Sequence, residues 1–128
     1  MKGVPVAGAK PNDVRELLRK GSLFLVDFWA AWCAPCVAME PYLRELAARL
    51  EKHGVPVLRL DVDDEETREY ALANGVTSVP TIVLFAGGRE VMRVVGFDLE
   101  ELAKLVERIK ELLPPQRAAD AASSSLQK

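Results

Sequence analysis

The chain's two cysteines, Cys33 and Cys36, are separated by only two residues. An apolar block typical of a buried strand, residues 23–26, precedes them, and apolar residues at helical spacing follow Pro41. The pair therefore falls where a strand leads into a helix. The unpaired N–H groups and the positive dipole end of a helix start favour a thiolate there. Residues three apart in a first helical turn also have a Cα separation that suits a disulfide, and that turn tolerates Pro35.

This placement predicts a redox pair that cycles between dithiol and disulfide. We expect Cys33, at the extreme helix start, to be the more exposed thiol and the nucleophile, and Cys36 to resolve the mixed disulfide. A structural staple is disfavoured because the bond would close a very small loop. A zinc site is disfavoured because it needs four Cys or His ligands, and the single histidine, His53, is distant in sequence and suits a solvated helix end. We expect no metal, and an inert buried pair is the other alternative.

An acidic residue, Asp27, stands inside the apolar run ahead of the cysteines. It lies between Val26 and Phe28 in a segment that should form a central strand, and burial without a full partner raises the pKa of a carboxyl group. A carboxyl poised nearer neutrality can exchange a proton with Cys36 during resolution. An exposed acid on an edge strand is the alternative.

The segment from Asp27 to Cys36, Asp-Phe-Trp-Ala-Ala-Trp-Cys-Ala-Pro-Cys, closely resembles the active-site segment of thioredoxins. Other landmarks follow in the family's order over roughly residues 14–112: Pro41 in the active-site helix, Gly75–Thr81 ahead of and around a proline, the Gly87–Gly88 turn, and Gly96. The resemblance implies a thioredoxin fold and a protein-disulfide reductase. It also implies a redox-active disulfide without any other cofactor, and re-reduction by a flavin-dependent thioredoxin reductase.

The same resemblance assigns residues around the cysteines. It implies that Trp29 packs under the site and that Trp32 lies beside Cys33 on the docking surface. It also implies that Pro80 is cis and faces the cysteines, although X-Pro bonds are trans by default. The Val79 backbone would then pair with an extended substrate, with Gly96 close by.

Three positions depart from the family pattern. Ala34 replaces the usual glycine between the cysteines, which should slightly stiffen the helix start. Val37 stands where many thioredoxins carry a lysine or arginine, so a local cation is missing. Arg59 occupies the position of a lysine that neighbours the buried acid, and it could either hold Asp27 ionised or extend into solvent.

Hydrophobic periodicity predicts the elements that must position these residues. Helices are expected over residues 11–20, from the cysteines to about 52, over 64–74 and over 99–113, and strands over 23–26, 56–61, 81–86 and 90–95. Asn12 or Asp13 should cap the first helix and Asp98 the last. Some consecutive strands should be joined through a helix and others by a hairpin. Together these connections predict an α/β domain, with a central mixed sheet and helices on both faces.

One domain, residues 11–113, is expected. Residues 1–10 form an N-terminal segment with a possible weak first strand, and residues 114–128 a disordered tail. A net charge of −2 argues against nucleic acid as a partner, and no window reaches the roughly 18 apolar residues of a membrane span. We therefore expect a cytoplasmic location. We also expect a monomer, which the resemblance implies acts on protein disulfides. The alternatives are an oxidase or isomerase of an oxidising compartment, and a non-catalytic interaction module.

Overall fold

The computed structural model describes residues 8–113. The weak first strand expected within residues 1–10 falls mostly, and the tail expected over 114–128 entirely, outside this range.

A four-stranded mixed sheet forms the centre of the molecule, with strand order β2-β1-β3-β4. Strand β1 (Phe24–Trp29) pairs in parallel with β2 (Val57–Asp61) and antiparallel with β3 (Thr81–Ala86), which in turn pairs antiparallel with β4 (Arg89–Val95). The mixed sheet predicted from the connections is confirmed. Strand β1 extends three residues beyond the predicted block, so Asp27 lies within a central strand with a neighbour on each side.

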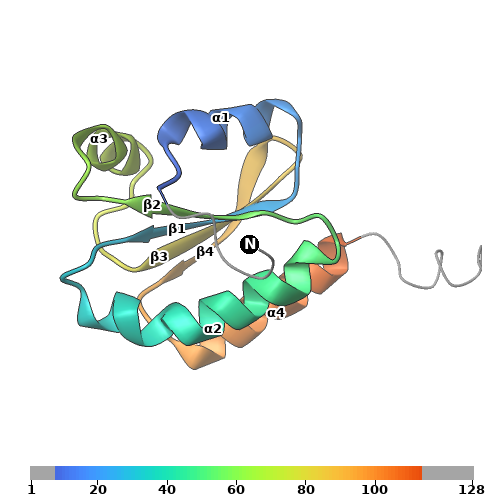
Figure 1. Ribbon diagram of the computed structural model, residues 1–128. Helices are drawn as coiled ribbons and strands as arrows, with labels where there is room; N and C mark the ends of the chain where they lie inside the picture. The colour runs from blue at the N-terminus through green and yellow to red at the C-terminus, as the bar shows by residue number, and fades with distance from the viewer. Residues whose placement is uncertain (1–7, 114–128) are drawn as a thin grey trace, which may run out of the picture.

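Two helices cover each face of the sheet (Figure 1). Helices α1 (Pro11–Arg19) and α3 (Glu65–Ala73) lie on one face, and α2 (Ala34–Glu51) and α4 (Leu99–Leu112) on the other. Because side chains alternate along a strand, β1 sends Phe24, Val26 and Phe28 into the core beneath α1 and α3. Leu25 enters the core beneath α2 and α4, and so Asp27, two residues further on, faces that side too.

The predicted cap of the first helix is wrong. Helix α1 is capped by Lys10 rather than by Asn12 or Asp13, because Pro11 occupies the first helical turn. Asp13 contributes from inside the helix, where its carboxylate accepts the Lys10 backbone N–H at 2.8 Å. The prediction for the last helix is confirmed, since Asp98 caps α4 by accepting the Glu101 backbone N–H at 3.1 Å.

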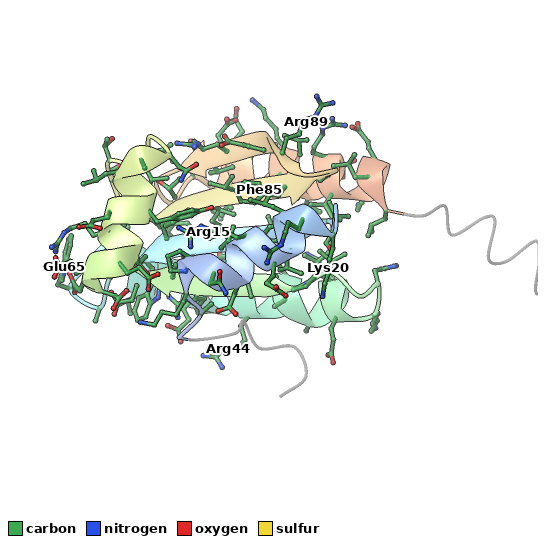
Figure 2. All side chains as sticks on the ribbon, turned by 90° about the horizontal axis from the view of Figure 1, so that it is seen from above. Arg15, Lys20, Arg44, Glu65, Phe85 and Arg89 are labelled. Atoms are coloured by element: carbon green, nitrogen blue, oxygen red, sulfur yellow. A yellow bond between two sulfur atoms is a disulfide. The ribbon has the colours of Figure 1, made fainter. Side chains whose placement is uncertain are left out.

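The predicted hairpin turn is also confirmed. Gly87 and Gly88, between β3 and β4, have φ values of +63° and +84°, which suit a two-residue hairpin and which other residues rarely adopt. Viewed from the α1 and α3 side, α3 lies across one end of the sheet (Figure 2). The start of α2, with the cysteines, lies at that same end (Figure 1).

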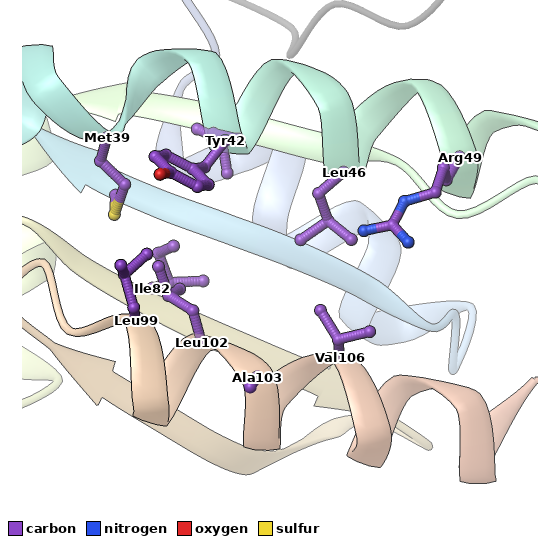
Figure 3. A pocket seen from close by; sticks show the side chains of 10 residues that line it. Met39, Tyr42, Leu46, Arg49, Ile82, Leu99, Leu102, Ala103 and Val106 are labelled. Carbon is purple, nitrogen blue, oxygen red and sulfur yellow. The ribbon is translucent and has the colours of Figure 1, made fainter.

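A shallow apolar groove of about 230 Å³ runs between α2 and α4. Met39, Tyr42 and Leu46 of α2 face Leu99, Leu102 and Val106 of α4 across it (Figure 3). The apolar residues that recur at helical spacing in α2 are all buried, namely Met39, Leu43, Leu46 and Leu50. In α4, Leu105 and Ile109 are buried, whereas Leu99 is largely exposed and lines the groove.

Candidate active site

Cys33 and Cys36 are joined by a disulfide, with their Cα atoms 5.2 Å apart. Cys33 is the N-cap of α2 rather than a residue of its first turn, and Cys36 lies within the helix. The Cys36 backbone N–H donates to Cys33 Sγ across 3.2 Å, so a helix-start N–H points at this sulfur. The predicted order of exposure is confirmed by a small margin, with Cys33 4% and Cys36 1% exposed.

Apolar residues from three segments surround the pair. Ala30 is buried against the cysteines, and Trp29, Val62 and Val79 pack around them. The Val79 carbonyl oxygen lies 3.6 Å from Cys33 Sγ. The Val79–Pro80 peptide bond is cis, as the resemblance implied, and the Pro80 carbonyl accepts the Gly96 N–H at 2.8 Å.

Trp32 is the exposed aromatic residue beside Cys33. It is 69% exposed, and its indole N–H donates to Asp63 Oδ1 across 2.9 Å. Together with Val62, Leu72, Val76 and Val79 it lines a second pocket of about 230 Å³. An exposed, positioned indole next to a reactive sulfur suits contact with a large partner.

Asp27 is only 1% exposed, so the edge-strand alternative is wrong. Its neighbour across the parallel strand pair is Arg59, whose Nε donates to Asp27 Oδ2 at 3.1 Å. Arg59 therefore turns toward the buried acid rather than into solvent. Burial nevertheless outweighs the nearby guanidinium and raises the pKa of Asp27 to about 6. The other carboxylate oxygen, Oδ1, is buried and has no hydrogen-bond partner among the described residues.

Trp29 connects this acid–base pair to the cysteines. The Arg59 guanidinium lies 3.9 Å from the centroid of the Trp29 ring, a close cation–π contact. The same ring packs against the cysteine pair. The redox pair and the buried ion pair thus share one aromatic side chain.

The other residues singled out from the sequence lie at the two ends of α2. Ala34 and Pro35 form the exposed start of α2, and Val37 is exposed one turn later with its apolar side chain in place of a cation. His53 is exposed beyond the end of α2. Within residues 8–113 no group of three potential metal ligands comes together, and no helix is long and apolar enough to cross a membrane.

Two residues of the site were not singled out from the sequence. Asp63 holds the Trp32 indole, and Glu40 Oε2 lies 3.4 Å from Arg59 Nη1. The spacing of Glu40, four residues after Cys36 on one helix face, was the available signal. An acid in a charged helix surface is common, however, and nothing local marked this one.

Comparison with known proteins places this geometry in a family. The sequence model of the thioredoxin family matches residues 6–111 of this chain. The chain belongs to the thioredoxin family. A thioredoxin from Alicyclobacillus acidocaldarius is 45% identical over 78 residues, which cover 60% of this chain and 70% of that relative. The solved structure of a mutant thioredoxin from Halobacterium salinarum superposes with a TM-score of 0.71 at 36% identity, covering 88% of this chain and 96% of that one.

A third relative is larger. The bifunctional thioredoxin reductase/thioredoxin of Mycobacterium leprae is 35% identical over 114 residues, which make up 88% of this chain and 23% of that protein. With the adjacent cysteine pair, these relationships make this thioredoxin-family chain a thiol-disulfide oxidoreductase that reduces protein disulfides. Members of the family act on disulfide substrates and are generally reduced by a thioredoxin reductase.

Proposed function

We propose that this protein reduces disulfides of partner proteins with Cys33 as nucleophile and Cys36 as resolving thiol. The Cys33 thiolate attacks one sulfur of the substrate disulfide, forms a Cys33–substrate disulfide and releases the other substrate sulfur as a thiolate. Cys36, after losing its proton, attacks Cys33 and releases the second substrate thiolate, closing the Cys33–Cys36 disulfide. Both released thiolates take up protons. Two electrons pass from the protein to the substrate.

The observation that carries this assignment is the Cys36 N–H aimed at Cys33 Sγ at the start of an 18-residue helix. A hydrogen bond to the charged form and the positive end of the helix both stabilise a thiolate at Cys33. Cys36 lies inside the first turn, which suits the thiol that acts second. The 5.2 Å Cα separation allows the bond to close without rearrangement of the helix.

Asp27 is proposed to take the proton from Cys36 during resolution. Its raised pKa of about 6 makes it a stronger base than an ordinary carboxylate, and its unpartnered Oδ1 can accept a proton. Trp29 and Arg59 support this role through their cation–π contact beside the cysteines. Ala34 and Pro35 support the cysteine pair by forming the start of α2.

An extended segment of the substrate is proposed to dock over Trp32, Val79, Pro80 and Gly96. The exposed indole offers a large apolar contact at low entropic cost. The Val79 segment, whose carbonyl already approaches Cys33, offers backbone groups for strand-like pairing. These contacts recognise the backbone and apolar side chains rather than one sequence.

We further propose that the protein acts in the cytoplasm as a monomer, needs no bound cofactor and takes its electrons from a flavin-dependent thioredoxin reductase. The fusion named in the Mycobacterium leprae relative supports a reductase partner.

Insulin disulfide reduction tests the proposal. The parent protein, kept reduced by dithiothreitol, should speed insulin precipitation, and Cys33→Ser should not. Cys36→Ser should accumulate a covalent complex between insulin and Cys33, visible by non-reducing electrophoresis and mass spectrometry. Equal rates in the parent and Cys33→Ser proteins would refute the assignment.

The reduction potential separates this function from the oxidase or isomerase. A value near −270 mV identifies a reductant, whereas a value between about −180 and −120 mV identifies an isomerase or oxidant. If the protein bound its partners unchanged with both cysteines replaced by serine, and reduced nothing, the interaction-module alternative would hold instead.

A further inference from the structure

Four charged side chains form a continuous line from the protein surface to the buried acid. Arg44 Nη2 lies 2.7 Å from Glu40 Oε1, Glu40 Oε2 lies 3.4 Å from Arg59 Nη1, and Arg59 Nε lies 3.1 Å from Asp27 Oδ2. The charges alternate along the line. Arg44 stands at the margin of the molecule (Figure 2), and Asp27 lies at the opposite, fully buried end.

The strand register creates this line. Asp27 and Arg59 are paired residues on parallel strands, and both face α2. Glu40 lies on α2 above them, so one guanidinium is within reach of two carboxylates. Arginine keeps its charge at all relevant pH values, and it therefore balances only one of the two negative charges.

We propose that Glu40 is a positioning residue that shares the Arg59 guanidinium with Asp27 and thereby keeps Asp27 able to carry the proton exchanged during resolution. This inference rests on the proposed role of Asp27. Glu40 touches neither cysteine and acts through Arg59.

Asp27 and Glu40 differ in their exposure and in the cations that they contact. Glu40 is 35% exposed and is also held by Arg44, so water and a second cation stabilise its charge. Asp27 is buried and has Arg59 as its single ion-pair partner among the described residues. The Glu40 charge raises the pKa of Asp27, partly offsetting Arg59, which lowers it. When Asp27 is protonated, Glu40 still pairs with the guanidinium, which would otherwise be buried without a counter-charge.

Arg59 and Glu40 are the charged groups that act on the pKa of Asp27. On its other side β3 presents Ile82, which is apolar. The start of α2 carries Cys33 and Cys36, and neither titrates in the disulfide form. The oxidised protein therefore isolates the titration of Asp27.

The test is the titration of the Asp27 carboxyl carbon by NMR in the oxidised protein, in the parent and in Glu40→Gln. Removing the Glu40 charge while keeping the shape should lower the Asp27 midpoint by about 0.5 to 1 pH unit. The matched control is Glu45→Gln, an exposed acid on the same helix, which should leave the midpoint unchanged. An unchanged midpoint in Glu40→Gln, or an equal fall in both variants, would overturn the proposal.

A kinetic measurement checks that the effect reaches the reaction. Reduced protein is mixed with the aromatic disulfide DTNB, and release of the second thionitrobenzoate reports the attack of Cys36 on the Cys33 mixed disulfide. The rate of this second phase should fall at low pH, and in Glu40→Gln the pH at which it falls should move down together with the NMR midpoint. A fall at the same pH as in the parent overturns the proposal.

The proposed roles of Asp27 and Glu40 can be refuted separately. An unchanged second phase in Asp27→Asn refutes the role of Asp27, whereas an unchanged Asp27 midpoint in Glu40→Gln refutes that of Glu40.

Discussion

Burial of Asp27 in the central strand makes the folding stability depend on pH. The group titrates near pH 6 in the folded protein and near its ordinary value of 3.8 when unfolded. Between these values the native state binds more protons than the unfolded state, so stability falls as pH rises. This contribution is fully present below about pH 4 and is lost as pH rises through about 6.

Asp27→Asn removes this titration, because asparagine resembles the protonated acid. Relative to the parent, the variant should therefore gain stability between pH 4 and pH 8, by up to about 3 kcal/mol. Urea unfolding of the oxidised proteins across this range measures the difference, with Glu45→Gln as a control that should follow the parent. A constant difference between the parent and Asp27→Asn would contradict the expectation.

The residues of the site were predictable where their chemistry is local. Cys33, Cys36 and Asp27 stand within one ten-residue segment, and a strand followed by a helix fixes their surroundings. The sequence left two directions open for Arg59, toward Asp27 or into solvent. The choice depends on the register of two strands whose paired residues, Asp27 and Arg59, are 32 positions apart. Glu40 was missed for the same reason, since only the packing of α2 on β2 brings it to Arg59.

Among the elements, α4 begins at a side-chain cap that lies outside the redox site. Asp98 accepts the Glu101 N–H and precedes two acids in the first turn, which also favour the helix dipole. Asp98→Ala should lower the free energy of unfolding by about 1 kcal/mol while leaving insulin reduction unchanged. Chemical denaturation measures the loss, and Asp98→Asn, which retains a capping side chain, should recover most of it. A variant Asp98→Ala as stable as the parent would show that the cap is not needed.

Element types followed from periodicity, whereas element ends depended on details of the first turn. Pro11 can occupy the first helical position at no cost in hydrogen bonds, and so the helix begins before the position that a capping Asp13 would allow. The same reasoning applies at α2, where Cys33 itself occupies the cap and Pro35 follows within the first turn. Neither lysine nor cysteine is among the residues preferred at a helix N-cap, so residue preference alone does not predict these two caps.

At the scale of the whole molecule, the sheet separates two hydrophobic cores. Ile109 belongs to the core under α2 and α4, and Leu60 to the core under α1 and α3. Ile109→Val should cost about 0.5 to 1.5 kcal/mol and Leu60→Ala about 2 to 5 kcal/mol. Because the two side chains share no cluster, the double variant should lose the sum to within about 0.5 kcal/mol. A coupling above about 1 kcal/mol, measured by denaturant unfolding, would contradict this separation.

The overall architecture was predictable because the order of elements leaves few arrangements. A hairpin requires antiparallel neighbours, and a helix between two strands allows a parallel pair with the helix on one face. The groove between α2 and α4 was not predictable. Leu99 continues the apolar pattern of α4, yet it stays exposed because α2 and α4 do not close over it.

Strand β4 is the outermost strand at one end of the described sheet, and its outward backbone groups are a potential template for another chain. Arg89, Glu90 and Arg93 lie along it, with Arg93 and Glu90 in an ion pair, and the β3–β4 register shifts between Leu84 and Phe85. Charges and an irregular register both discourage a foreign strand from adding to such an edge. We expect concentrated solutions of this protein to resist growth into fibrils or stacked sheets, even though its central strands are strongly apolar.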